Sequence, residues 1–210
     1  SLKCNVGGTN NVAVGFESLK ANTTGACNVS VGVFTLDANT TGACNTGLGY
    51  GALSVNTTAS NNTAVGFYSL LENTTGEVNS AFGAFALRTN TTGFGNTAIG
   101  KNSLYTNNGN NNTAVGHEAL ELNTSGANNV AVGRQALEAN TTGASNVAVG
   151  YYAGLQNTTG NCNVSLGVAS NQNTSTGSNN TAIGHVALLS NTTASNNTAV
   201  GGFALCSNTT

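Results

Sequence analysis

Residues 129–145 read NVAVGRQALEANTTGAS, and this 17-residue pattern decides the fold because the rest of the chain repeats it. Alignment on Asn-x-Ala-Val-Gly gives twelve units, each of 17 residues except the sixth, which has 16, and the last, which is cut short. We number the positions of the unit from 1 to 17, starting at its first Asn. The units begin at Asn11, Asn28, Asn45, Asn62, Asn79, Asn96, Asn112, Asn129, Asn146, Asn163, Asn180 and Asn197.

A unit this short cannot bury a core alone, so the repeat predicts a solenoid in which one coil stacks on the next. We expect a strand at positions 1–5, where β-formers at positions 2 and 4 flank a small residue. The invariant Gly at position 5 predicts a positive φ or close packing of a neighbouring backbone. Stacking would also align the position-1 asparagines in a ladder. The predicted fold class is a β-solenoid of the parallel β-roll or β-helix kind.

The other two segments of the unit have different compositions. Positions 6–11 combine good helix formers with two adjacent residues that look buried, which favours a short helical turn, with a second short strand as the alternative. Positions 12–17 read Asn-Thr-Thr-Gly in the consensus and predict a loop. We expect residues 1–210 to form a single solenoid of about twelve coils, cut in mid-repeat at both ends.

The composition argues against several classes of function. Charged residues make up 6% of the chain, and the five Lys and Arg are too scattered to form a basic patch for nucleic acid. No apolar run approaches the ~18 residues of a membrane span. The two histidines, His117 and His185, lie four units apart, Glu118 and Glu121 fit a solvated face, and no phosphate-binding, nucleophile or metal motif occurs. The sequence therefore predicts neither an enzyme nor a metal site.

Acceptor patterns for N-linked glycans, Asn-x-Ser/Thr, recur at position 12 with the full Asn-Thr-Thr or Asn-Thr-Ser triplet. A turn would need the Asn and the Gly but not the hydroxyl, so we predict N-glycosylation here, and sugars would keep a nearly uncharged chain soluble. No cofactor is expected beyond these covalently attached glycans. The predicted acceptors are Asn22, Asn39, Asn56, Asn73, Asn90, Asn123, Asn140, Asn157, Asn173 (displaced by one residue), Asn191 and Asn208. Six more sequons, which chance could produce in so Asn- and Thr-rich a chain, occur at Asn28, Asn61, Asn111, Asn163, Asn179 and Asn196.

Five cysteines allow two hypotheses. Cys27 and Cys44 share position 17 in adjacent units, and stacking would bring them within reach of a disulfide. Cys4 and Cys206 lie near opposite ends of the chain and would meet in a head-to-tail filament, where an intermolecular disulfide would join them. The alternative is that the cysteines are small buried residues, and Cys162 has no counterpart at its position in a neighbouring unit.

Aromatic residues recur at positions 6 and 7. They would stack under sugars, line a protein interface or be partly buried against neighbouring coils. They are Phe16, Phe34, Tyr50, Phe67, Tyr68, Phe85, Tyr151, Tyr152 and Phe203.

The strand motif, for which Asn129-Val130-Ala131-Val132-Gly133 is a good example, resembles the head repeats of trimeric autotransporter adhesins. That resemblance implies a parallel β-roll, commonly in a trimer. In repeat style and sequon density the chain also resembles the glycan-coated extracellular fibrils of aquatic microbes. This second resemblance implies an extracellular or cell-surface structural protein.

The expected function is therefore the structural subunit of an N-glycosylated extracellular fibril that assembles head to tail. Its partners would be copies of itself and its glycans. Two alternatives are an adhesin-head or phage-tail-fibre-like binding protein, which could be trimeric, and an ice-binding solenoid. Against the last, the paired Thr residues are adjacent and so point to different faces.

Overall fold

The computed structural model describes residues 1–209, which form short parallel strands joined by loops. The chain divides into two compact units, Ser1–Asn108 and Gly109–Thr210, and the division falls in the shortened sixth repeat. The first unit contains β1 (Val12–Val14), β2 (Val29–Val31), β3 (Thr46–Leu48), β4 (Thr63–Val65), β5 (Ser80–Phe82) and β6 (Thr97–Ile99). The second contains β7 (Thr113–Val115), β8 (Val130–Val132), β9 (Val147–Val149), β10 (Val164–Leu166), β11 (Thr181–Ile183) and β12 (Thr198–Val200).

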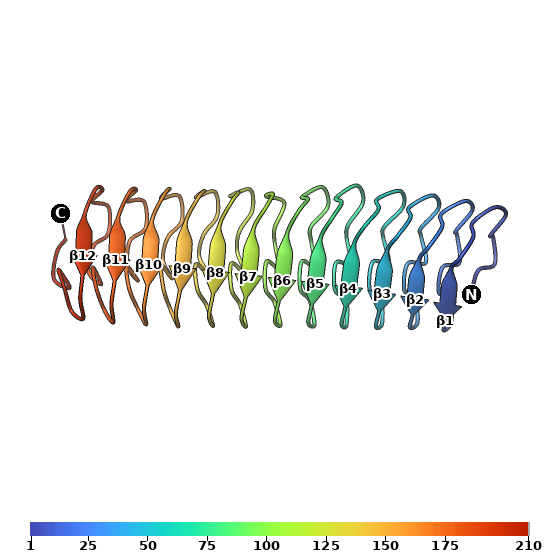
Figure 1. Cartoon of the computed structure of the whole chain (residues 1–210), viewed down its shortest axis with the longest axis horizontal. Coiled ribbons are helices and arrows are strands. Elements are labelled where there is room, and N and C mark those ends of the chain that lie inside the picture. The colour runs from blue at the N-terminus through green and yellow to red at the C-terminus, as the bar shows by residue number, and fades with distance from the viewer. Residues whose placement is uncertain (210) are drawn as a thin grey trace. The chain divides into compact units, whose positions relative to one another are not determined.

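Within each unit the strands pair in parallel and in register, each residue opposite the residue one repeat later. In the first unit Val12 pairs with Val29 and Thr63 with Ser80, and in the second Val130 pairs with Val147. Figure 1 shows β1–β6 lying side by side in chain order, and β7–β12 doing the same. The predicted β-solenoid with one coil per repeat is confirmed in both units. Its continuity as one solenoid across residues 1–210 stays a prediction.

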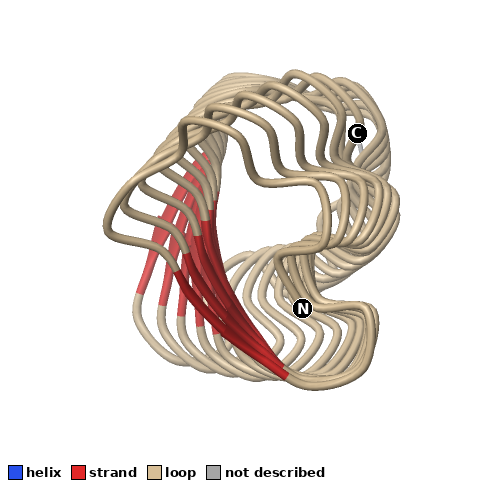
Figure 2. Cartoon of the chain, turned by 90° about the vertical axis from the view of Figure 1, so that its right-hand side faces the viewer, coloured by secondary structure: helices blue, strands red, loops and turns tan. Residues whose placement is uncertain are grey.

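The loop at positions 6–11 is not helical. Residues 1–209 contain no helix, so the predicted helical turn is wrong, and each coil in Figure 2 has one strand and is otherwise loop. Positions 7 and 9 adopt a left-handed conformation, with φ of 56° at Phe34 and 49° at Leu36. Their N–H groups donate to neighbouring coils: Phe34 N to Phe16 O at 3.0 Å and Leu36 N to Ala52 O at 3.0 Å.

The left-handed leucines are stable because burial offsets their strain. A left-handed non-glycine residue costs roughly 1–2 kcal/mol, whereas burying a Leu side chain contributes about 1.5–3 kcal/mol. Leu19, Leu36 and Leu70 are fully buried. An α-helical turn would direct its hydrogen bonds within the coil, whereas here the N–H groups of positions 7 and 9 donate to the neighbouring coils. Stacking therefore overrides local helix propensity.

The core of each coil is narrow and contains few large side chains. In most coils it consists of the position-9 Leu, small residues at positions 3 and 8 such as Ala81 and Ala86, and the asparagines of positions 1 and 12. Position 9 is Gly154 in the ninth coil and Asn171 in the tenth. The strand side chains at positions 2 and 4 point outward, while the small residue between them is buried, as in β5 with Ser80, Ala81 and Phe82. The small residue at position 3 thus faces the core.

Position 5 requires Gly for two reasons. Gly83 has φ of 134°, a conformation that side-chain-bearing residues rarely adopt. A Cβ added there would lie 2.7 Å from the carbonyl carbon of Gly100 in the next coil. The invariant Gly therefore supplies both the positive φ and the close backbone packing that the sequence predicts.

We predict that Gly83→Ala destabilises the fold by roughly 2–5 kcal/mol, because backbone strain adds to a clash with backbone atoms. The measurement is urea or thermal unfolding followed by circular dichroism. Gly7→Ala is the matched control, since its Cβ would meet nothing closer than Thr24 Cγ2 at 3.8 Å. A Gly83→Ala protein as stable as the Gly7→Ala protein would contradict this account of position 5.

Candidate functional site: two asparagine ladders and an exposed apolar strand face

The position-1 asparagines form the expected ladder. The Oδ1 of Asn28 accepts a hydrogen bond from the backbone N–H of Asn45, one coil later, at 2.9 Å. Its Nδ2 donates to the carbonyl oxygen of Gly42, at position 15 of the same coil, also at 2.9 Å. A position-1 Asn such as Asn28 therefore joins its coil to the next one and connects the end of the loop to the start of the strand.

Position 12 carries a second ladder that sequence reasoning missed. Nδ2 of Asn39 donates to Oδ1 of Asn22 in the preceding coil at 2.9 Å and to the carbonyl oxygen of Gly42 at 3.0 Å. Both amide hydrogens are therefore used, and the side chain is fully buried. Gly42 O accepts from Asn28 and Asn39 at once, so the two ladders meet at the carbonyl of position 15.

This geometry argues against the predicted glycosylation at position 12. A sugar on Nδ2 replaces one amide hydrogen and needs open space around the nitrogen. These side chains are at most 1% exposed, and every one of them donates from Nδ2 within the coil stack. The folded chain therefore has no room for a glycan at Asn22, Asn39, Asn56, Asn73, Asn90, Asn123, Asn140, Asn157 or Asn191.

Two asparagines show that the position-12 ladder does not require a sequon. Asn5 and Asn107 occupy position 12 without a sequon, yet Asn5 accepts from Asn22 at 2.8 Å and Asn107 donates to Asn90 at 3.3 Å. These two asparagines were the signal in the sequence that could have identified the ladder. The position-13 hydroxyls are also structural, since Thr23 Oγ1 donates to Thr40 O at 3.0 Å.

The remaining two predicted acceptors lie elsewhere. In the tenth coil Thr174 fills the ladder position and its Oγ1 accepts from Asn191 at 3.0 Å, which leaves Asn173 exposed at position 11. Asn208 is half-buried, and the third residue of its sequon, Thr210, lies outside the described residues.

The cysteines are all free thiols. Cys27 and Cys44 are exposed on adjacent coils, and the disulfide predicted between them is not formed. Residues stacked at one repeat position have parallel Cα–Cβ bonds, so their Cβ atoms stay about 4.8 Å apart, beyond the roughly 3.5–4.5 Å of a disulfide. Cys4 is exposed and Cys206 half-buried, each in its own unit.

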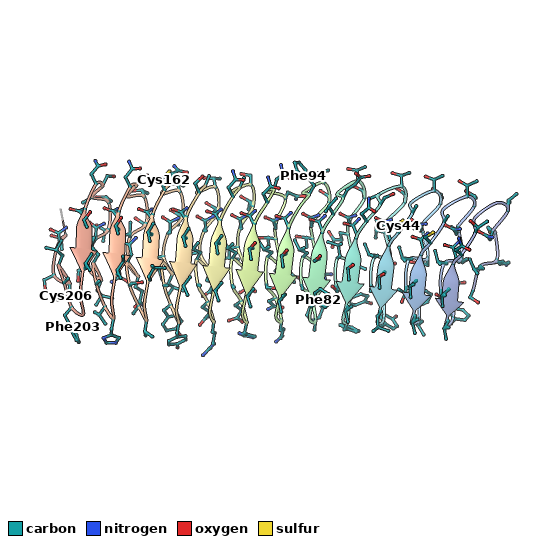
Figure 3. The ribbon with its side chains drawn as sticks, in the orientation of Figure 1. Cys44, Phe82, Phe94, Cys162, Phe203 and Cys206 are labelled. Atoms are coloured by element: carbon teal, nitrogen blue, oxygen red, sulfur yellow. The ribbon has the colours of Figure 1, made fainter. Side chains whose placement is uncertain are left out.

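The outward strand residues of the first unit form an apolar face, which we call the strand face. Exposed fractions reach 57% at Val14, 46% at Leu48, 40% at Phe82 and 42% at Ile99. In Figure 3, Phe82 lies toward the lower edge of the coils, whereas Cys44 and Phe94 lie toward the upper edge. The strand face consists of the exposed apolar residues of positions 2, 4 and 6: Val12, Val14, Phe16, Val29, Leu48, Tyr50, Phe67, Phe82 and Ile99. The exposed Lys101 lies at position 6 beside them, two residues after Ile99.

Aromatic rings at positions 6 and 7 extend this face along the coils. Phe16 contacts Phe34 with ring centroids 5.6 Å apart, Phe34 contacts Tyr50 at 5.8 Å, and Tyr50 contacts Phe67 at 5.6 Å. The first two pairs meet edge to face, at 86°. The rings therefore pack against their neighbours, as the partial-burial alternative holds, while Phe16, Tyr50 and Phe67 remain at least 41% exposed.

Carboxylates cluster at one place in the second unit. One oxygen from each of Glu118, Glu121 and Glu138 lies within 4.8 Å of the others, and burial, reinforced by the charge of Glu118, raises the pKa of Glu138. Nδ1 of His117 lies 3.2 Å from the Glu118 carboxylate. Such half-exposed acidic groups are common on protein surfaces, so the cluster by itself assigns no metal.

Comparison with protein-family models, with curated proteins and with solved structures finds no match for this chain. Among residues 1–209 no helix has the length and apolar character needed to cross a bilayer. The functional reading therefore depends on the geometry of the ladders and the strand face.

We predict that Asn73→Ala lowers the stability of the fold strongly and Thr75→Val hardly changes it, although each substitution removes the same sequon. Asn73→Ala leaves Asn56 Oδ1 without its donor and Asn90 Nδ2 without one acceptor, at a cost of roughly 2–5 kcal/mol. Thr75 is exposed, so Thr75→Val should change stability by less than about 0.5 kcal/mol. Chemical unfolding of protein made in bacterial cytoplasm measures both. Equal stabilities of the two variants would show that the ladder is unimportant.

Proposed function

We propose that this chain is a structural protein of an extracellular fibre, in which copies associate through the strand face. The observation that carries the proposal is the exposed apolar surface of β1–β6 and the aromatic rings beside them. Its nine side chains expose on the order of 800 Å², above the ~300–600 Å² of the largest patch on a typical monomer. That area equals the ~800 Å² that each partner contributes to a standard protein interface.

The regularity of the strand face supports a second copy as its partner. Outward residues recur once per coil, in register along the strands of the first unit. Only a surface with the same spacing can repeat a favourable contact at every coil, as in-register sheets do when identical side chains interdigitate. A second copy of this chain has that spacing. None of the nine side chains is charged, and Lys101 is the one charged residue at positions 2, 4 and 6 of the first unit, so little repulsion between identical faces opposes the contact.

Fibril formation of this kind does not depend on a sugar coat at position 12. A contact between strand faces would instead cover the apolar surface that an uncharged chain leaves exposed. The extracellular location of the fibre belongs to this proposal and follows from the resemblance of the repeats to surface fibrils and adhesin heads. A trimer packed through the same face is the adhesin-like version of the proposal, and the stoichiometry of the assembly distinguishes it from a fibre.

The ice-binding alternative has little support. The position-13 hydroxyls donate to backbone carbonyls of the next coil, as Thr40 Oγ1 does to Thr57 O at 3.0 Å. In the Thr pairs of residues 1–108 the position-14 residue, such as Thr41, is exposed with no hydroxyl bond to a neighbouring coil, and Thr57 is the one position-13 residue that shares this state. A single row of hydroxyls is a poor match to a two-dimensional lattice.

We predict that Leu48→Glu combined with Phe82→Glu converts a self-associating protein to a monomer. Both side chains are at least 40% exposed, so charge there disfavours association while the fold is retained. Sedimentation velocity gives the oligomeric state, and circular dichroism checks the fold. Thr58→Glu with Thr92→Glu, two exposed position-14 residues, is the matched control and should associate like the unaltered chain. An unaltered chain that is monomeric at high micromolar concentration would refute the proposal.

Head-to-tail assembly with a bond between Cys206 and Cys4 of the next copy stays a prediction. Under oxidising conditions, non-reducing electrophoresis should then show a ladder of multimers that reducing agent collapses. Cys4→Ser should abolish the multimer bands, and Cys162→Ser should leave them unchanged. A single monomer band from the oxidised unaltered chain would count against the bond.

A further inference from the structure

The sequons of this chain fall into two groups that the sequence alone does not distinguish. Nine lie in the position-12 ladder, and those of Asn28 and Asn163 lie in the position-1 ladder, where each is at most 2% exposed. Five others have an exposed Asn, and the half-buried Asn208 belongs to neither group. The five are Asn61, Asn111, Asn179 and Asn196 at position 17, and Asn173 at position 11.

The position-17 asparagines have a fixed backbone and a free side chain. Their φ angles are 61° at Asn61, 56° at Asn111, 57° at Asn179 and 65° at Asn196, a left-handed conformation that Asn adopts more readily than most residues. The backbone N–H of Asn61 donates to Ala43 O at 3.0 Å. In the described part of the chain none of the four side-chain amides has a hydrogen-bond partner, so both Nδ2 hydrogens are available.

The third residue of each position-17 sequon is the first residue of a strand. Thr63 follows Asn61 by two residues and starts β4, and Thr181 follows Asn179 and starts β11. Both side chains are partly exposed on the outward side. Val occupies the same strand position in β1, β2, β8, β9 and β10, so the hydroxyl is not needed for the strand.

We propose that these four position-17 asparagines and Asn173 are the residues at which the folded chain carries N-linked glycans. In the reaction Nδ2 attacks the anomeric carbon of a sugar diphosphate donor, lipid- or nucleotide-linked. The carbon–oxygen bond to the diphosphate breaks, a nitrogen–carbon bond forms, Nδ2 loses one proton and the diphosphate carrier leaves. The product keeps one Nδ2 hydrogen, and the sugar extends into solvent.

A glycan on an asparagine of either ladder would instead prevent the coils from stacking. At Asn73 the lost hydrogen is one that binds Asn56 Oδ1 or Gly76 O, and the sugar would have to fit into a fully buried position. Folding and modification of the ladder therefore exclude each other, whereas folding and modification of the five exposed residues are compatible. This inference does not depend on the proposed self-association.

The test uses a eukaryotic secretory pathway, where sugars are attached before folding. A ladder-blind variant lacks the eleven buried sequons but keeps every ladder Asn. In this variant the third residue of each buried sequon is replaced by Ala. Nine of these residues are exposed position-14 residues, and the other two are strand residues at a position where other coils already have Ala. The changes are made at Thr24, Ser30, Thr41, Thr58, Thr75, Thr92, Ser125, Thr142, Thr159, Ser165 and Thr193. The half-buried Asn208 is left unchanged and counted with neither group.

The ladder-blind variant should be secreted, melt cooperatively and carry sugar at the five exposed asparagines, as read by glycosidase treatment and peptide mapping. Its matched control adds Thr63→Val, Thr113→Val, Thr181→Val, Thr198→Val and Ser175→Ala, and should fold without those sugars. In the unaltered chain, any molecule that melts cooperatively should have sugar-free ladders. Ladder sugars in a cooperatively melting fraction would overturn the inference. A ladder-blind variant that lacks sugar at the five sites would also overturn it. The same holds if that variant melts cooperatively only after its sugars are removed.

Discussion

The stack is held together by buried amide groups that meet at the carbonyl oxygen of position 15. Asn62 and Asn73 both donate to Gly76 O, and Asn129 and Asn140 both donate to Gly143 O. Each amide also contacts an adjacent coil, so one set of bonds closes the coil and stacks it. An unpaired amide in this interior would cost about 1–3 kcal/mol. The repeat therefore has to place Asn at both positions in nearly every coil.

The interior contains buried amides beside its Leu and Ala side chains, while the strand face is apolar, which departs from the usual distribution. The coil cross-section is too narrow for large side chains beyond one Leu, such as Leu87, so amide ladders fill much of it. The larger apolar side chains, such as Phe82 and Ile99, lie on the outer side of the strands. The same narrowness requires Gly at position 5 and left-handed residues at positions 7 and 9. Surface apolarity is thus a consequence of a coil with little interior, and it leaves the chain with a face suited to another copy.

Much of the fold could be predicted from the sequence because the repeat is regular. The strand, the stacking of one coil per repeat and the position-1 ladder all follow from period and residue type, although the strand runs only over positions 2–4 of the predicted 1–5. The loop at positions 6–11 could not be predicted in this way. Segments such as 134–139 contain good helix formers, yet Leu137 has φ of 52° and its N–H donates to Ala153 O at 3.0 Å. Hydrogen bonds between coils outweigh local propensity, and propensity says nothing about a neighbouring coil.

The candidate sites show the same division between sequence and structure. The sequence by itself determined the repeat, the strand, the invariant Gly and the number and spacing of sequons. Only the tertiary structure decided which asparagines are accessible. Asn56 and Asn61 both begin sequons, yet Asn56 is enclosed by its own coil and its neighbours, while Asn61 is exposed. A sequon describes three consecutive residues, whereas Asn56 is enclosed through Asn39 and Asn73, each 17 positions away, which contact it only when the coils stack.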